Sequence, residues 1–160
     1  MALQKSGQAV SDTLKSWRDK NLTTIPGTGT GIEGHCLAVQ THAWQVPAGQ
    51  YAPSALAAWE ATPKKYRHTD PAKAPVGAVH FWVNHNGKGY GHIASQSDVV
   101  GHSWSSDTPR TGHIGLQATA WFSSPHGWNM HYLGWANWLE GYALPVKALP
   151  KKKPVGPVNT

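Results

Sequence analysis

The sequence predicts an α+β domain in which helices come first and an antiparallel β-sheet follows. Residues 9–61 hold three short segments whose apolar side chains recur at helical spacing. From residue 74 onwards the pattern changes to apolar, β-branched and aromatic runs, which are typical of strands. Two of these runs flank Asn86-Gly87, a pair that favours a hairpin. Helical segments followed by strand segments indicate helices packed on an antiparallel sheet.

The first helix is expected at residues 9–22. Val10 and Leu14 share one of its faces, and Ser11 is placed to cap its N-terminus. Residues 23–34, "TTIPGTGTGIEG", are rich in glycine and threonine around a proline. This composition predicts an irregular loop that delivers the chain to the only cysteine.

Two shorter helices are expected next. One covers residues 36–46, with Cys36 at its N-terminal end and on the same face as Val39. The other lies within residues 51–61, "YAPSALAAWEA", and Ser54 is its expected N-cap.

The rest of the chain reads mainly as strands. A turn near Glu140-Gly141 divides the last strand candidate, and a short helix is expected at residues 116–122. The strand candidates are residues 74–83, 90–95, 99–104 and 131–145.

We expect a single domain at residues 1–146, in which residues 1–33 supply the first helix and the loop after it. Residues 147–160 are basic and proline-rich and are expected to form a tail or linker. The formal charge of +6 lies mostly in this tail, because residues 1–146 hold ten basic and eight acidic side chains. A nearly neutral body gives no reason to expect nucleic acid as a partner. The domain is expected to be monomeric.

The sequence carries no mark of export or of membrane insertion. Its first dozen residues lack the apolar run of a secretory leader, and no stretch approaches the ~20 apolar residues of a membrane span. A lone cysteine cannot form an internal disulfide, so the role of Cys36 is either packing or chemistry. We expect a protein that is soluble and made in a cytoplasm.

Cys36 and His92 are the candidate catalytic pair. A thiol attacks as a thiolate, and a helix N-terminus and a nearby imidazolium both favour that form. His92 follows a glycine on the strand candidate "YGHIAS", with its ring on the face opposite Ile93. His113, in "TGHIG", repeats the local pattern but falls in an expected loop. The alternative reading of Cys36 is a small buried hydrophobic residue.

Several short motifs, taken in order, resemble the CHAP family of cysteine, histidine-dependent amidohydrolases and peptidases. They are "GHC" at a helix start, then "SALAAW", "PVGAV" and "GYGHIA", with "YLGW" late in the chain. The similarity covers about residues 30–145 and is greatest to variants carried by bacteriophages of actinobacteria. The resemblance implies a papain-like fold, Cys36 as nucleophile and His92 as base. It also implies hydrolysis of an amide bond in peptidoglycan.

The chain departs from the family pattern at two positions. His35 stands before the cysteine, where the family often has glutamine, and it is a candidate oxyanion donor beside the backbone N–H of Cys36. The residue that orients the imidazole is usually Glu, Asp or Asn on a later strand. Asp107 is the acid available there, and Ser105 and Ser106 remain alternatives because a register shift of one residue would exchange the side chains.

Trp82 and Trp104 are expected to floor the substrate groove, because indole rings line sites that bind sugars and extended peptides. No cofactor or metal is expected. The sequence has no HExxH motif and no Cys-x-x-Cys pair, and only Glu33 lies where some CHAP enzymes hold calcium.

The resemblance to CHAP enzymes therefore implies a peptidoglycan hydrolase of the phage endolysin type, with a virion-associated hydrolase as a close variant. Such an enzyme would accumulate in the host cytoplasm and reach the wall through a membrane lesion made by another protein. The rival hypothesis is a wall-binding or virion structural domain that keeps the fold without turnover. In both cases the expected partner is bacterial peptidoglycan.

Overall fold

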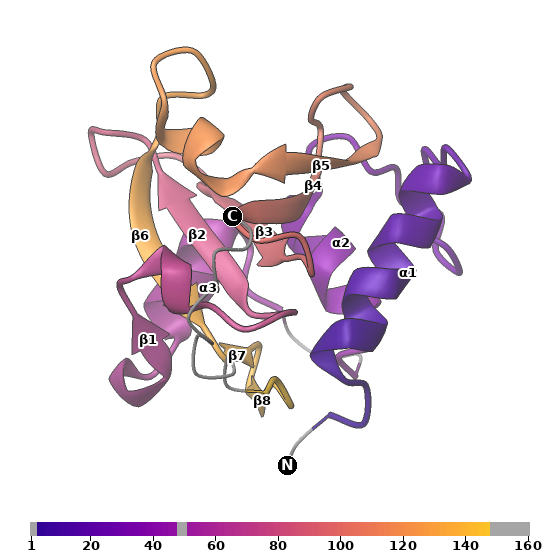
Figure 1. Ribbon diagram of the computed structural model, residues 1–160, viewed down its shortest axis with the longest axis horizontal. Helices are drawn as coiled ribbons and strands as arrows, with labels where there is room; N and C mark the ends of the chain where they lie inside the picture. Colours follow the sequence, from indigo (N-terminus) through magenta and orange to yellow (C-terminus); the bar gives the residue numbers. More distant parts are fainter. Residues whose placement is uncertain (1–2, 48–50, 148–160) are drawn as a thin grey trace, which may run out of the picture.

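The computed structural model describes residues 3–47 and 51–147, which form α-helices on a six-stranded antiparallel sheet (Figure 1). The strand order is β1-β6-β2-β3-β4-β5, and a two-stranded ribbon, β7-β8, lies apart from it. The predicted α+β class is confirmed at this level. The helices are α1 (Gly7–Asp19), α2 (Cys36–Ala43) and α3 (Ala55–Ala61), with short 3₁₀ turns η1 (Lys64–Tyr66), η2 (Pro71–Lys73) and η3 (Thr119–Ser123). The strands are β1 (Arg67–His68), β2 (Val79–Val83), β3 (His92–Gln96), β4 (His102–Ser106), β5 (Ile114–Ala118), β6 (His131–Ala136), β7 (Trp138–Leu139) and β8 (Tyr142–Ala143).

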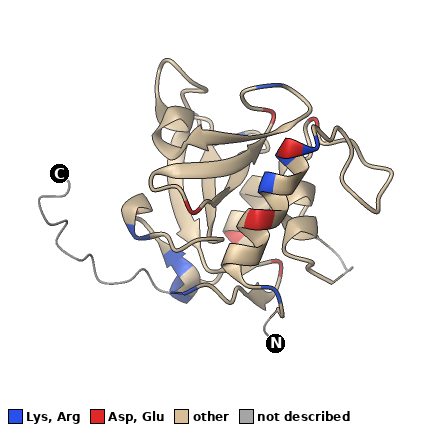
Figure 2. Cartoon of the chain, turned by 45° about the vertical axis from the view of Figure 1, so that its right-hand side comes forward, with Lys and Arg blue, Asp and Glu red and all other residues tan. Residues whose placement is uncertain are grey.

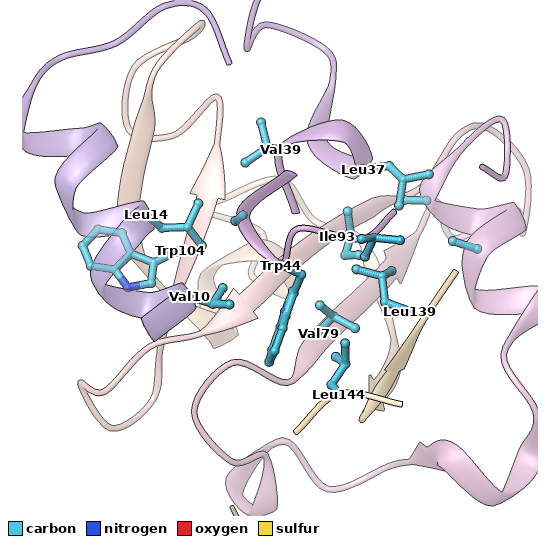
Figure 3. Close-up of a cluster of buried hydrophobic side chains, with 14 of the residues drawn as sticks. Val10, Leu14, Leu37, Val39, Trp44, Val79, Ile93, Trp104, Leu139 and Leu144 are labelled. Atoms are coloured by element: carbon cyan, nitrogen blue, oxygen red, sulfur yellow. The ribbon is translucent and has the colours of Figure 1, made fainter. Parts of the chain in front are cut away.

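The main core lies between the helices and the sheet. α1 contacts β4 and β5, α2 contacts β3 and β4, and α3 contacts β2 and β3. Leu14, Val39 and Trp44 from the helical part meet Val79 and Ile93 from the sheet, all fully buried (Figure 3). Burial of such large apolar side chains stabilises the fold by roughly 1.5–3 kcal/mol each.

A second, smaller cluster covers the opposite face of the sheet. Successive side chains of a strand point to opposite faces, so Phe81 joins the helix-side core while Trp82 joins this second cluster. Both faces of β2 are therefore buried, which explains why all of its residues except His80 are apolar. The second cluster consists of Trp82, Ala94 and Phe122, with Trp121, Trp128, Met130 and Tyr132 packed against it.

The first helix begins earlier than the sequence predicted. Its N-cap is Ser6, whose hydroxyl accepts a hydrogen bond from the backbone N–H of Ala9 at 3.1 Å. Ser11 is buried instead, and it accepts a hydrogen bond from the indole N–H of Trp104 at 2.9 Å. Both serines suit a cap, and tertiary packing chooses between them.

The other expected elements are largely confirmed. α2 begins at Cys36 but ends at Ala43, ahead of Gln45 in the left-handed region. Ser54 caps α3 as expected, accepting from the N–H of Ala57 at 3.1 Å. The turn at Glu140-Gly141 joins β7 to β8.

Two parts of the sheet were not predicted. Residues 114–118 form β5, where a loop and the start of a helix were expected, and only η3 corresponds to that helix. β5 forms because every residue of β4 from His102 to Ser106 pairs with it. The two-residue β1 pairs with β6 at the sheet edge.

Charges of both signs are dispersed over the fold. α1 carries acidic and basic residues together (Figure 2), and two of its residues, Lys15 and Asp19, form an ion pair of 2.9 Å. Within the described residues, no helix is long and apolar enough to cross a membrane. Of the expected tail at 147–160, residues 148–160 lie outside the described part of the chain.

Candidate active site

Cys36 is the first residue of α2 and is partly buried. The chain reaches it through a tight turn in which Gly34 has φ 71° and the N–H of His35 bonds the carbonyl of Ile32 at 3.1 Å. His35 is the N-cap residue, but its side chain makes no capping hydrogen bond. The side chain of His35 thus leaves the first N–H groups of α2 uncapped, and the positive end of the helix faces the thiol of Cys36, which accepts from the backbone of Leu37.

The thiol of Cys36 lies against the edge of β3. The β3–β4 pairing ends at Ser95 and Trp104, which leaves the earlier part of β3 open to α2 on that side. Burial raises the pKa of the Cys36 thiol to about 11, although hydrogen bonding from the backbone of Ile93 and Leu37 lowers it in part. A thiol with that pKa is protonated at neutral pH. Desolvation thus outweighs the helix N-terminus, contrary to the expectation of an activated thiolate.

His92 opens β3 and is only 5% exposed. Aromatic rings surround its imidazole: Phe122 at 5.2 Å, Trp128 at 4.7 Å and Trp82 at 5.9 Å between ring centroids. Burial lowers the pKa of His92 to about 3, because the apolar surroundings penalise the imidazolium. The ring is therefore neutral at physiological pH.

A serine fixes the tautomer of this ring. Nε2 of His92 lies 2.8 Å from the hydroxyl of Ser105, and that hydroxyl donates its one proton to the carbonyl of Ser106 at 2.8 Å. Ser105 can then only accept from the imidazole, so Nε2 carries the proton and Nδ1 carries the lone pair. Nδ1 has no hydrogen-bond partner among the described residues and is not one of the buried polar atoms sealed from solvent. It is the nitrogen available to take a proton.

The two candidate catalytic groups are neighbours through the backbone. The Cys36 thiol contacts the backbone of Ile93, the residue after His92. No hydrogen bond joins Cys36 to His92, both of which are among the described residues. The structure thus shows a neutral thiol next to the strand that presents a neutral imidazole, and not a thiolate–imidazolium pair.

Asp107 does not orient the imidazole, contrary to the sequence-based choice. Its carboxylate accepts hydrogen bonds from the backbone N–H groups of Gly34 at 2.8 Å and Gly112 at 2.7 Å. Asp107 also has φ 65°, which turns the chain away from the line of β4. The strand therefore presents Ser105 to His92, one of the alternatives left open. Ser106 is buried, and its hydroxyl finds no partner in the described part of the chain.

Neither tryptophan expected in the groove is available to a substrate. Trp82 is 0% and Trp104 is 2% exposed. Trp82 is covered by Phe122 and its neighbours, and Trp104 lies on the helix side beneath Arg18, whose guanidinium is 4.9 Å from the ring centroid. Sequence reasoning passed over Tyr90, which is 82% exposed and lies two residues before His92 in "GYGHIA".

His35 is exposed, and its ring is already engaged. Its Nδ1 lies 2.9 Å from the carbonyl of Glu33, so this nitrogen donates. In the neutral ring Nε2 then bears a lone pair and cannot donate to an oxyanion. The backbone N–H of Cys36 needs no such protonation, which makes it the better donor of the two expected.

Two concavities of the surface are lined by residues other than Cys36 and His92. One, of about 340 Å³, lies beside Arg67 and Trp135, and the other, of about 270 Å³, includes His113 and Arg110. His113, the alternative base, precedes β5 and lies in the second of them. Among the described residues, no three histidine, cysteine or acidic side chains are grouped as a metal site would need.

Comparison with protein-family models, with curated proteins and with solved structures found no match for this chain. The similarity to CHAP enzymes accordingly remains a similarity of short motifs.

Proposed function

We propose that the chain is a cysteine-dependent amide hydrolase of papain-like architecture that cleaves peptidoglycan, as phage endolysins of the CHAP type do. One observation carries the proposal most directly. The only thiol of the chain lies at a helix N-terminus against the strand that presents His92, and Ser105 holds that imidazole with its Nδ1 lone pair free. The order of the CHAP-like motifs along the chain supports peptidoglycan as the substrate class.

The chemistry assigns one role to each group. Nδ1 of His92 takes the thiol proton while the sulfur of Cys36 attacks the carbonyl carbon of the amide. The backbone N–H of Cys36 donates to the oxygen that becomes negative. The imidazolium then protonates the leaving nitrogen as the C–N bond breaks, and a thioester remains. Water, deprotonated by the same imidazole, hydrolyses the thioester to a carboxylic acid and restores the thiol.

Proton transfer in this scheme takes place during attack. Burial keeps the thiol pKa near 11 and the imidazole pKa near 3, so the ion pair is not the resting state. No hydrogen bond joins the two groups, so Sγ and Nδ1 have to approach each other before the proton is transferred.

A second candidate, a wall-binding or virion structural domain without turnover, is favoured by one observation. The thiol and the imidazole are both neutral and share no hydrogen bond. A domain that had lost catalysis would keep the fold and have no need of a contact between these groups.

Digestion of purified bacterial walls separates the two candidates. The native protein is expected to release fragments with new amino and carboxyl termini, detectable by mass spectrometry, and these termini identify the amide bond that is cut. Cys36→Ala and His92→Ala are expected to abolish release, while His113→Ala retains it. Wall binding by Cys36→Ala is expected to persist.

Release at the native rate by Cys36→Ala would refute cysteine catalysis. Binding without any release by the native protein would favour the non-catalytic domain. If His113→Ala lost fragment release while His92→Ala kept it, His113 and not His92 would be the general base.

A further inference from the structure

Asp107 joins the loop before Cys36 to the connection between β4 and β5. One carboxylate oxygen accepts from the N–H of Gly34, two residues before the nucleophile, at 2.8 Å. The other accepts from the N–H of Gly112 at 2.7 Å. The backbone N–H of Asp107 itself donates to the carbonyl of His113 at 2.9 Å. A single side chain therefore ties together segments that are 73 residues apart.

We propose that Asp107 is a positioning residue for the nucleophile, a clamp that holds the entry to α2 so that Cys36 meets β3. The inference rests on the proposed function and assigns Asp107 a role other than orienting the imidazole. Hydrogen bonds from backbone N–H groups to a carboxylate are charge-assisted and about twice as strong as neutral ones. Two of them at one side chain fix both loops.

The left-handed backbone conformation at both ends of the clamp explains why these segments need a stabilising contact. Gly34 has φ 71° and Asp107 has φ 65°, so each lies in the left-handed region. For a residue other than glycine this conformation costs roughly 1–2 kcal/mol and persists only where the surroundings fix it. The remaining hydrogen bonds of the entry loop that flank Cys36, such as Ile32 N–H to Thr23 and His35 N–H to Ile32, are local to that loop.

The clamp also has an electrostatic consequence for the thiol. Burial is the main reason why the pKa of Cys36 is high, and the negative charge of Asp107 raises it further. The carboxylate thus holds the thiol in place while disfavouring its thiolate. Removing the charge should make the thiol more acidic and the enzyme slower at the same time.

Asp107→Asn tests this in the full chain. Asparagine tolerates the left-handed region and keeps one acceptor oxygen, but it lacks the charge and the second acceptor. We expect faster hydrogen exchange at the amide of Gly34 or Gly112 and a midpoint of Cys36 alkylation at lower pH. We also expect wall digestion to fall about 10- to 100-fold in kcat, because a misplacement of roughly 1 Å can cost about 100-fold. KM should stay near the native value.

Asp70→Asn is the matched control. Asp70 also accepts from a backbone N–H, that of Ala72 at 3.0 Å, but it does so near the β1 edge of the sheet. We expect its exchange at Gly34, its alkylation midpoint and its digestion rate to match the native protein.

Unchanged exchange at both glycines in Asp107→Asn, or an unchanged or higher alkylation midpoint, would overturn the clamp. A native kcat would overturn it as well. If the native protein does not cut walls, the proposed function fails, whereas exchange and alkylation still decide the clamp by themselves.

Discussion

At the scale of single residues, the site uses a hydroxyl where a carboxylate was expected. Ser105 accepts from Nε2 of His92, and its own hydroxyl donates a hydrogen bond to the carbonyl of Ser106. With its proton donated to Ser106, Ser105 fixes the tautomer, but it adds no negative charge to stabilise an imidazolium. The low pKa of His92, which burial causes, agrees with this neutral partner.

Ser105→Ala is expected to reduce wall digestion about 10- to 100-fold, since the base loses the acceptor that fixes its tautomer. The variant also leaves Nε2–H unsatisfied, which costs roughly 1–3 kcal/mol of stability. Ser106→Ala is the control, because that hydroxyl has no partner in the described part of the chain and its loss should leave digestion within twofold of native. Nitrogen-15 NMR of the His92 ring checks the tautomer directly. Equal digestion by the two variants would contradict the role of Ser105.

The residue-level outcome shows which part of a site a sequence can predict. The position of Cys36 at a helix start and of His92 on a strand opposite Ile93 followed from local periodicity, and the structure places both residues accordingly. The orienting residue could not be chosen in this way. Whether Ser105 or Asp107 faces His92 depends on where β4 ends and on the left-handed backbone at Asp107.

At the scale of elements, the face of the sheet opposite the helices holds two buried, neutral histidines. His80 donates through Nε2 to Gln96 at 2.9 Å and accepts the hydroxyl proton of Tyr132 at Nδ1, at 2.7 Å. Burial lowers the pKa of His80 to about 4 and that of His92 to about 3. Protonation of either ring places a charge in this buried layer and therefore destabilises the packing of β2 and β3.

Acid should therefore destabilise the fold in a defined pH window. Both histidines have folded pKa values below the unfolded value near 6.5, so their contribution is complete above about pH 6.5 and is lost as the pH falls towards 3 to 4. Each unit of difference between the folded and the unfolded pKa of a histidine corresponds to about 1.4 kcal/mol in the free energy of unfolding. Thermal melts of the native protein should show Tm falling from pH 6.5 to 4. His92→Gln should have a shallower slope, and an equal slope would show that this histidine titrates normally in the fold.

Elements that depend on distant partners were the ones that the sequence did not reveal. β5 needs β4 beside it, and its own residues 114–118 carry a glycine and little strand character. Trp82 was expected to floor a substrate groove, but η3 and the segment after it cover that face of the sheet. The start of α1 was predicted too late in the chain. The helix begins at Gly7, which packs so closely on Val76 that an added Cβ would lie 1.9 Å from its carbonyl oxygen, and this long-range contact is not visible in the local sequence.

At the scale of the whole molecule, a helix-side core fixes the position of α2 and an aromatic cluster on the opposite face fixes the ring of His92. The sequence predicted this division into helices and antiparallel strands, because it follows from periodicity. It did not predict how deeply the two layers bury the site between them. That depth keeps both candidate catalytic groups neutral, through the desolvation of the thiol and of the imidazole.

The pH dependence of Cys36 alkylation by iodoacetamide tests this central claim most directly. A neutral, buried thiol predicts a rate that keeps rising with pH through about 10 without a plateau, since its pKa is about 11. An unperturbed thiol would level off above its midpoint near 8.5. A plateau reached below about pH 7 would reveal a thiolate at rest, stabilised by an imidazolium or by the helix end, and would contradict the account of two neutral groups that exchange a proton only during attack.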